Sequence, residues 1–502
     1  MKLGTVISTL DGPSTTSFDF VITEKEKVLK GQFVSVDTKE GTIIARIDEI
    51  IKTNRYFERP DSVSEYEKGG ASISTLFPVS RWEFLIGKAA ILGLFSKDMI
   101  KRSKFPPSPG AEVIPCEEKN LVKFLNIDIE KGLDIGMLEY QDIPAKINIT
   151  RLLHKHMAIL AMSGAGKSYL ATVLFEELMD RKEEYGQVAV VVLDPHGEYT
   201  SFAKDRNYLK KVRIIKGNDV QISINDFTSG SFSQFLGGFS PAQEVLLDRA
   251  LEHLRKEFKD SGAFSLDNLI NSLESDASLK SNVKDPVVGK LIALRRLRLF
   301  GKFDYPGLKD VKAGNLVIVD MSDLLSQKKR QVIAASLAKN LFAERQRGKI
   351  PPFVLVVEEA HNFAPEKTKK ENAISKAIIE KIAREGRKFY ASLCLISQRP
   401  IHLSTTALSQ CNTHIILRVT NPYDLEHISR TSEGLTREVM NSISSLRTGE
   451  AVIVGEAVGY PSFIKVRERR SDDPLHSKSF EEAAIEFSKT KKQSDKDMDA
   501  FL

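Results

Sequence analysis

The distribution of apolar residues divides the 502-residue chain into a β-rich first part and a longer part of mixed periodicity. Short apolar or alternating runs occupy residues 18–22, 33–36, 42–50 and 84–95. Glycines at positions 31, 41, 69, 70 and 87 are expected to divide these runs into separate strands. Several short strands with regular turn signals are typical of a small β-barrel, which we place at residues 1–110.

Beyond residue 150, runs of strand length alternate with stretches of helical periodicity. The strand-like runs lie at 187–193, 315–319, 353–357, 391–396 and 414–418, and they are mostly apolar, as in strands buried on both faces of a sheet. Their alternation with helices predicts an α/β core with a mainly parallel sheet over residues 151–465. A helical stretch at about 240–305 is expected to be an insertion in this core.

Two further segments complete the predicted organisation. Residues 104–110 are rich in proline and typical of a linker, and residues 111–150 are expected to form strands that lead into the core. Residues 466–502 are polar and charged, with one short helical stretch at 480–487. Because this last segment can bury little apolar surface, we expect a C-terminal tail.

The clearest chemical signal is the segment Ala161-Met-Ser-Gly-Ala-Gly-Lys-Ser168. An apolar run precedes it and a helical pattern follows, which is the order of a phosphate-binding P-loop. Gly164 and Gly166 allow successive backbone N–H groups to point at phosphate oxygens at a helix N-terminus. Lys167 is expected to reach the β- and γ-phosphates of ATP, and the Ser168 hydroxyl is expected to hold Mg²⁺.

The P-loop residues are the candidates for nucleotide contacts, namely Ser163, Gly164, Ala165, Gly166, Lys167, Ser168 and Tyr169. Ala161 stands where the motif usually has its first glycine. A dinucleotide-binding fingerprint is the alternative interpretation, because Gly164 and Gly166 begin a GxGxxG pattern. Its third glycine position holds Tyr169, which is too bulky for close packing of the helix on the strand.

A second segment, Phe353-Val-Leu-Val-Val-Glu-Glu-Ala-His361, has the pattern of a Walker B strand. Glu358 is expected at the carboxyl end of the strand, where it would hold a Mg²⁺-bound water. Glu359 is expected to polarise the attacking water as a general base. Aspartate is usual at the first position, and the longer glutamate suits a contact that runs through water.

Gln398 follows the strand-like run at 391–396 and is expected to sense the γ-phosphate and the attacking water. We place this strand between the P-loop strand and the Walker B strand, an arrangement that belongs to motor ATPases with an added catalytic glutamate. A P-loop kinase is the main alternative. It also needs a lid and an acceptor pocket, for which the sequence shows no pattern.

Arg384 and Arg387 lie at the end of a predicted helix that Gly386 should terminate. An arginine held there can reach the γ-phosphate in a neighbouring subunit as a trans-acting finger. The other interpretation is a surface arginine paired with Glu385, and both interpretations stay open. Arg418, after a later strand, is a third candidate.

Asp194 and Glu198 follow another predicted strand, at the edge where parallel sheets bind their ligands. They are candidates for the network of water and metal around the phosphates. A zinc site is not expected, because no spacing of histidines and cysteines resembles a zinc motif. His154 and His156 precede the P-loop strand, and we expect them to be structural.

Composition adds little to these motifs. With 41% hydrophobic and 28% charged residues the chain is typical of a globular protein, and no apolar run approaches the roughly 18 residues of a membrane span. The N-terminus lacks a secretory pattern and the three cysteines form no disulfide framework, so we expect a cytoplasmic protein without a membrane partner. The net charge of +6 is too small to indicate nucleic-acid binding by itself.

Together these motifs resemble the HerA family, in the FtsK–HerA branch of motor ATPases. The matching segments follow one another along most of the chain, and they are Leu3-Gly-Thr-Val6, Leu152-Leu-His-Lys-His156, the P-loop, Asp194-Pro-His-Gly-Glu-Tyr199, Val357-Glu-Glu-Ala-His361, Ala383-Arg-Glu-Gly-Arg387, Ser397-Gln-Arg-Pro400 and the stretch 411–422. A glutamate at position 358 also fits this family.

The resemblance implies a RecA-like core in a homo-hexameric ring, with ATP and Mg²⁺ at the subunit interfaces and double-stranded DNA in the central channel. Members of the family are archaeal DNA translocases or helicases that act with the nuclease NurA in DNA end resection and recombinational repair. The resemblance further implies that the N-terminal barrel faces NurA and that the tail at 466–502 braces a neighbouring subunit.

Three functions stay open at this point. The first is an ATP-driven translocase or helicase on double-stranded DNA, the second is a motor of the same branch that moves protein, and the third is a scaffold that uses ATP to assemble a nuclease complex. For contacts with cargo in the channel, the candidates are Lys367, Lys369, Lys370 and the glycine-rich stretch 230–238.

Overall fold

The computed structural model describes most of the chain, namely residues 1–8, 12–23, 27–54, 57, 60–68, 83–96, 99–260, 262–276, 280–368, 373–472, 481–482 and 484–488. The chain divides into two compact units. The first unit joins Met1–Glu177 to Glu359–Glu468, and the second joins Leu178–Glu358 to Arg469–Leu502. Lys369, Lys370 and most of the predicted tail after residue 472 lie outside the described residues.

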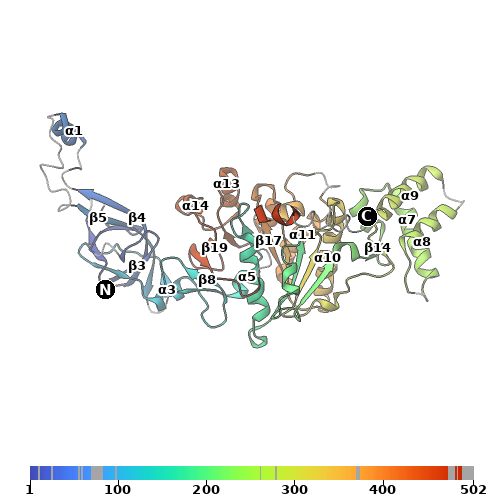
Figure 1. Ribbon diagram of the computed structural model, residues 1–502, viewed down its shortest axis with the longest axis horizontal. Coiled ribbons are helices and arrows are strands. Elements are labelled where there is room, and N and C mark those ends of the chain that lie inside the picture. Colours follow the sequence, from blue (N-terminus) through green and yellow to red (C-terminus); the bar gives the residue numbers. More distant parts are fainter. Residues whose placement is uncertain are drawn as a thin grey trace. The chain divides into compact units, whose positions relative to one another are not determined.

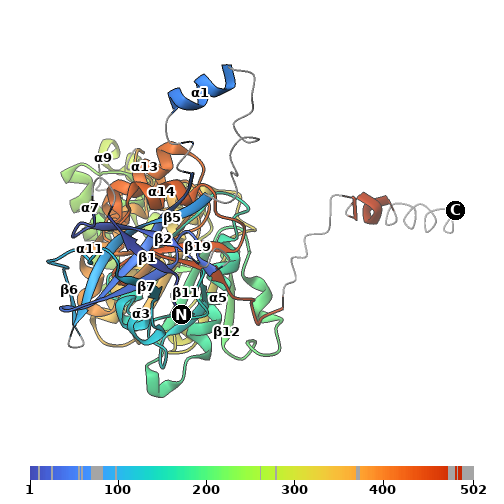
Figure 2. The ribbon, with the colours of Figure 1, turned by 90° about the vertical axis from the view of Figure 1, so that its left-hand side faces the viewer.

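In the described part of the first unit, antiparallel strands close into a barrel (Figures 1 and 2). In order around the barrel these strands are β2 (Ser17–Ile22), β1 (Gly4–Ile7), β7 (Glu112–Pro115), β3 (Phe33–Thr38), β4 (Gly41–Asn54) and β5 (Glu83–Ser96), and β5 pairs with β2. The short strand β6 (Met99–Lys101) pairs with the end of β5. The predicted N-terminal barrel is therefore confirmed.

The barrel differs from the sequence-based prediction at two places. Residues 104–110 connect β6 to β7 within one sheet instead of linking two domains, and β7 continues the barrel beyond residue 110. Gly87 does not divide β5 but lies within it, opposite Phe20 of β2. A Cβ atom at Gly87 would come within 2.4 Å of the buried Phe20 ring, so the glycine makes room for this ring in the core.

The first unit also contains the sheet that carries the P-loop strand. Its strands, in order, are β17 (Ala391–Ser397), β10 (Met157–Leu160), β18 (Thr413–Ile416), β19 (Glu450–Gly455), β20 (Ser462–Val466), β8 (Leu133–Leu138) and β9 (Pro144–Ile147). Strand β10 runs parallel to both of its neighbours, and the strands from β18 to β9 pair antiparallel. The helices of this unit are α1 (Pro60–Lys68), α3 (Glu118–Phe124), α4 (Ile149–Leu153), α5 (Lys167–Asp180), α11 (Lys376–Glu385), α12 (Thr405–Leu408), α13 (Pro422–Thr431) and α14 (Arg437–Ile443).

The second unit is built on parallel strands in the order β12 (Val212–Lys216), β15 (Leu316–Asp320), β11 (Ala189–Asp194) and β16 (Phe353–Val357). Every residue of β11, β15 and β16 is buried, which explains why these strands are continuous apolar runs in the sequence. The strands predicted from those runs are present, and the α/β fold with a mainly parallel sheet is confirmed. Helix α10 (Gln327–Gln346) lies between β15 and β16 in the chain.

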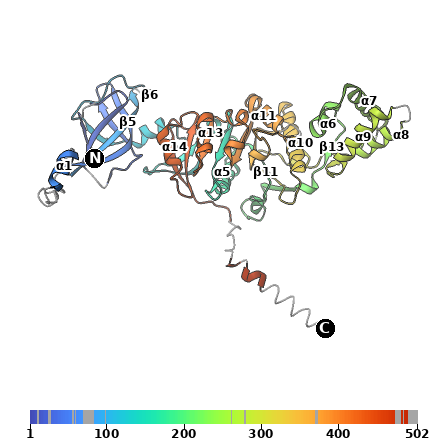
Figure 3. The same ribbon diagram turned by 90° about the horizontal axis from the view of Figure 1, so that it is seen from above.

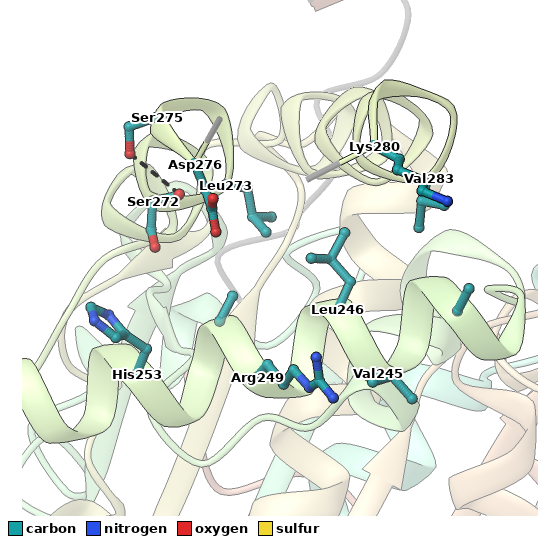
Figure 4. A pocket seen from close by; sticks show the side chains of 12 residues that line it. Val245, Leu246, Arg249, His253, Ser272, Leu273, Ser275, Asp276, Lys280 and Val283 are labelled. Carbon is teal, nitrogen blue, oxygen red and sulfur yellow. Dashed lines mark hydrogen bonds between the residues drawn. The ribbon is translucent and has the colours of Figure 1, made fainter. Parts of the chain in front are cut away.

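The predicted helical insertion is present in the second unit (Figure 3). It consists of α6 (Ser229–Leu236), α7 (Pro241–Glu257), α8 (Leu266–Ser275) and α9 (Ser281–Arg295), with the short pair β13 (Ile222–Ser223) and β14 (Phe300–Gly301) at its base. Helix α6 occupies most of the glycine-rich stretch 230–238, which is therefore not an extended loop. A groove of about 710 Å³ lies between α7, α8 and α9, and Leu246 points into it from α7 (Figure 4).

No helix among the described residues has both the length and the apolar composition that crossing a membrane requires.

His156 joins three elements at the start of the P-loop strand. It is 2% exposed and has a left-handed backbone with φ of 63°. Its Nδ1 accepts a hydrogen bond from the backbone N–H of Leu393 in β17 at 3.0 Å, so its Nε2 carries the proton and donates to the carbonyl of Ala383 in α11 at 2.9 Å. This histidine is structural, and burial lowers its pKa to about 4.

The lowered pKa of His156 predicts sensitivity to acid. Below pH 6.5 the unfolded chain binds a proton on this side chain that the native state excludes until about pH 4, so native stability is lost as the pH falls through this window. The free energy of unfolding should fall by up to about 3 kcal/mol from this residue. Urea unfolding between pH 4 and pH 8 measures the effect. A His156→Asn variant should be less stable at neutral pH but should lose less stability on acidification, and an equal loss in both proteins would contradict the assignment.

Candidate functional site

The P-loop is held between the ends of two parallel strands. The N–H of Ala161 donates to the carbonyl of Ser397 at the end of β17, and the N–H of Met162 donates to the carbonyl of Arg418 just after β18. Ala161 is fully buried in this contact, so a small side chain suits the position where the motif usually has glycine. Gly164 and Gly166 have φ of 76° and 99°, the left-handed region that glycine adopts without strain.

Helix α5 begins at Lys167, directly after this turn. The first N–H groups of a helix have no partner within it, and together with the helix dipole they favour an anion. Ser163 and Gly164 are exposed in the turn, Ala165 is buried, and Ser168 and Tyr169 are half-buried. The loop therefore has the strand, glycine-containing turn and helix that the sequence predicted for phosphate binding.

Lys167 and Glu359 meet in the interior of the first unit. The Lys167 Nζ lies 3.4 Å from Glu359 Oε1, and the two residues are 8% and 3% exposed. Glu359 has φ of 50° and ψ of 48°, a left-handed conformation that is uncommon for residues other than glycine. Such strain occurs mainly where function needs a side chain in one direction. The structure thus brings together the candidate phosphate-binding lysine and the candidate general base.

His361 lies on the other side of the Glu359 carboxylate. Its Nδ1 is 3.3 Å from Glu359 Oε2 and 3.1 Å from the Ser397 hydroxyl oxygen. Burial lowers the pKa of His361, and the positive charges of Arg399 and Lys167 lower it further, while Glu359 opposes the shift. His361 was part of the motif match, but the sequence pattern assigned it no role, because only the fold places it beside Ser397.

Gln398 is half-buried directly after β17, one residue beyond Ser397. This position is the carboxyl end of a strand parallel to β10, which is the edge of the sheet where the P-loop lies. Arg418 is half-buried beyond β18, and its Nε is among the buried atoms without a hydrogen-bond partner in the described structure. Both side chains therefore belong to the P-loop edge of the sheet.

Arg384 and Arg387 lie at the opposite end of the P-loop strand. Helix α11 ends at Gly386 as predicted, and a Cβ atom there would come within 2.3 Å of the Ala391 carbonyl at the start of β17. The preceding residue Ala383 accepts the hydrogen bond from His156, which stands before β10. Both arginines are exposed, and Arg384 forms a long ion pair of 3.9 Å with Glu380, one helical turn earlier, and not the predicted pair with Glu385.

Two acidic candidates are engaged inside the second unit. Asp194 accepts hydrogen bonds from the backbone N–H groups of residues 196–199, and its carboxylate thereby fixes the turn that follows β11. Burial raises the pKa of Asp194, and these four N–H groups oppose the shift. Glu358 is fully buried and accepts a hydrogen bond from the Tyr199 hydroxyl at 2.9 Å. Glu198 is half-buried in the same turn.

The sequence analysis assigned no role to Tyr199. Its place five residues after Asp194, at the end of the motif, is the one sequence feature that marks it. The tyrosine ring is fully buried, and its hydroxyl points at the Walker B acid. A fully buried tyrosine hydroxyl requires a partner, and a carboxylate is a strong one. Tyr199 therefore connects the turn after β11 to the end of β16.

The donor set fits Mg²⁺ bound together with nucleotide. Among the described residues no cluster of three or more histidine, cysteine, aspartate or glutamate side chains could hold a metal ion. The Ser168 hydroxyl of the first unit is a hard oxygen donor beside the phosphate-binding turn, and Mg²⁺ bound with nucleotide takes one or two protein ligands, water and phosphate oxygens. The residues present thus suit a cation that arrives with the phosphates.

Lys367, a candidate for cargo contact, is exposed in the loop after the Walker B segment. It lines a pocket of about 590 Å³ together with Ile401, Tyr423 and Arg430. The second candidate, the stretch 230–238, belongs to the helical insertion described above.

Comparisons with known proteins point to one family of helicases. Residues 133–341 match the family model described as "Helicase HerA, central domain". A probable helicase of Methanocaldococcus jannaschii (MJ1565) is 28% identical over 471 residues, which cover 89% of this chain and 87% of the relative. The DNA double-strand break repair helicase HerA of Pyrococcus furiosus is 27% identical over 516 residues, which cover 90% of each chain.

Among solved structures, VirB4 of Thermoanaerobacter pseudethanolicus resembles this fold with a TM-score of 0.52 and 18% identity, over 69% of this chain and 98% of that one. At this identity the likeness concerns the fold alone, and it agrees with a RecA-like P-loop core. The sequence match supplies the closer relationship, because it spans nearly the whole length of proteins that carry the family's name. The chain therefore resembles the HerA family of helicases over most of its length, and residues 133–341 match that family's central domain.

Proposed function

We propose that this chain assembles into a homo-hexamer that hydrolyses ATP. The hexamer uses this energy to translocate along double-stranded DNA and to unwind it. The observation that carries the proposal is the buried contact of Lys167 with Glu359, which joins a phosphate-binding lysine to a carboxylate that can act as a base. The relative in Pyrococcus furiosus is named a DNA double-strand break repair helicase, which supports DNA as the cargo and DNA repair as the process.

The proposed chemistry follows from the placement of these side chains. Lys167 and the N–H groups at the start of α5 bind the β- and γ-phosphates, and Lys167 turns from Glu359 towards them. Glu359 then accepts a proton from the water that attacks the γ-phosphorus, and Gln398 orients this water. Mg²⁺, held by the Ser168 hydroxyl and through water by Glu358, would neutralise charge on the phosphate oxygens. Ser163, Ala165 and Tyr169 are proposed to line the nucleotide, and Asp194 to fix the turn that carries Glu198.

The position of the two arginines supports a site that is completed by a neighbouring subunit. The P-loop follows the carboxyl end of β10, whereas Arg384 and Arg387 lie near its amino end, so neither is placed to reach the nucleotide of its own P-loop. Both are exposed and available to a second copy of the chain. A trans-acting arginine in this class of enzyme contributes about 10³–10⁵ in rate.

DNA end resection requires a nuclease, and we propose that the motor acts with NurA, with the N-terminal barrel as the docking surface. The tail at 466–502 is proposed to brace a neighbouring subunit. A motor for protein cargo and an ATP-dependent scaffold for a nuclease complex are the alternatives that the experiments below separate.

The nucleotide site is tested by two substitutions. Lys167→Ala should lower both nucleotide binding and ATP turnover, and turnover should fall by at least about a hundredfold. The substitution removes the positive charge that stabilises the negative charge developing on the phosphate oxygens. Glu359→Gln should lower turnover by a similar factor but retain nucleotide binding, because it removes only the base. ATP hydrolysis and binding of a fluorescent ADP measure the two effects, with the exposed Lys309→Ala as control. Full turnover in Lys167→Ala would refute the site.

The trans arginine is tested by mixing subunits. Arg387→Ala and Lys167→Ala proteins should each be inactive alone, and the same should hold for Arg384→Ala if that residue is the finger. Mixed rings contain some interfaces with both an intact P-loop and an intact arginine, so ATP turnover should reappear on mixing. The trans role of an arginine is wrong if its alanine variant is inactive and stays inactive when it is mixed with Lys167→Ala. This outcome is judged for Arg387 and Arg384 separately.

A further inference from the structure

Both oxygens of the Glu359 carboxylate lie close to other side chains, whereas a general base needs only a free oxygen in order to accept a proton. The left-handed backbone of Glu359 is strained for a residue other than glycine, and surrounding contacts have to maintain it. Lys167 lies at 3.4 Å from Oε1 and His361 at 3.3 Å from Oε2. Oε2 is buried and has no hydrogen-bond partner in the described structure, and the His361 Nδ1 faces it across this distance.

His361 is fixed by the strand that leads to Gln398. It lies in the short helical turn Ala360–Asn362, and only 12% of its side chain is exposed. The Nδ1 that faces Glu359 is also 3.1 Å from the Ser397 hydroxyl. Ser397 is the last residue of β17, and its hydroxyl accepts the N–H of Arg399 at 3.1 Å, so the turn that carries Gln398 is closed on the same oxygen.

Ser397 also contacts the P-loop, because its carbonyl accepts the N–H of Ala161 at 3.2 Å. One residue therefore contacts the P-loop through its backbone and His361 through its side chain. An ionised Glu359 carboxylate favours the tautomer with hydrogen on Nδ1, since a lone pair there would face the negative charge. In that tautomer the Nδ1–H can donate to the Ser397 hydroxyl oxygen, while the same nitrogen lies 3.3 Å from Glu359 Oε2.

We propose that His361 is a positioning residue that fixes the Glu359 carboxylate relative to the end of β17, so that the base and Gln398 meet the same water. This inference rests on the proposed function and adds a residue to its site. Lys167 cannot supply this restraint during hydrolysis, because its ammonium group is then engaged by the phosphates. His361 acts only through Glu359 and does not touch the reacting atoms.

Three substitutions at position 361 separate positioning from simple packing. The amide nitrogen of asparagine can take the place of the imidazole Nδ1, the amide nitrogen of glutamine takes the place of Nε2, and leucine supplies neither. His361→Leu and His361→Gln should lower kcat for ATP about ten- to hundredfold, with KM for ATP within about twofold of wild type, because a base displaced by about 1 Å loses rate and not substrate affinity. His361→Asn should recover most of kcat. His253→Leu, an exposed histidine in α7, is the control.

A double-mutant cycle with Glu359→Gln makes the test independent of folding defects. If His361 acts through Glu359, His361→Leu should cause no further loss of kcat in the Glu359→Gln background. The same four proteins should show non-additive urea unfolding midpoints, a readout that needs no ATP turnover. Failure of the proposed function would appear as a wild-type protein without ATP hydrolysis, and the unfolding cycle would still report on His361. The inference is overturned by wild-type kcat in His361→Leu, by equal kcat in the Asn and Leu variants, or by additive midpoints in the cycle.

Discussion

The ion pair between Lys167 and Glu359 is the interaction on which the site depends. Both side chains are almost fully buried, and removing one partner of such a pair leaves the other charge without compensation in the interior. In the proposed mechanism the pair also has a chemical consequence, because the lysine gives up Glu359 in order to bind phosphate. Binding of the nucleotide by Lys167 would therefore release Glu359 to act as the base. The left-handed backbone of Glu359 and the contact with His361 keep the carboxylate in place during this exchange.

The fold places this pair at the edge of the sheet where the carboxyl ends of parallel strands lie side by side. The P-loop follows β10, Ser397 and Gln398 stand at the end of the parallel strand β17, and backbone hydrogen bonds from Ala161 and Met162 tie the loop to both neighbouring strands. At the other end of β10, His156 and Gly386 pack the end of α11 closely against the start of β17, and Arg384 and Arg387 lie beside this contact in the sequence. The proposed role of the two arginines in a neighbouring subunit's site follows from this separation of the two ends of β10.

Much of this could be predicted from the sequence, because fully buried strands leave a continuous apolar signal. The strands β11, β15, β16 and β17 were found in this way, and the glycine pattern of the P-loop was found because left-handed turns require it. The positions that could not be predicted depend on pairing between distant segments. Gly87 faces Phe20 across two strands, β7 returns to the barrel after a proline-rich connection, and the Tyr199 hydroxyl finds Glu358 159 residues away. The local periodicity of apolar residues gives no information about such contacts.

The central claim is that this site couples ATP hydrolysis to DNA. The most direct test is Mg²⁺-dependent ATP turnover of the full chain with and without linear duplex DNA, at low and moderate salt, in the wild type and in Lys167→Ala. A DNA-coupled motor predicts marked stimulation by duplex DNA that weakens as salt rises, since phosphate contacts release counterions, and no stimulated turnover in Lys167→Ala. Turnover that is the same with and without DNA at both salt concentrations would contradict the claim.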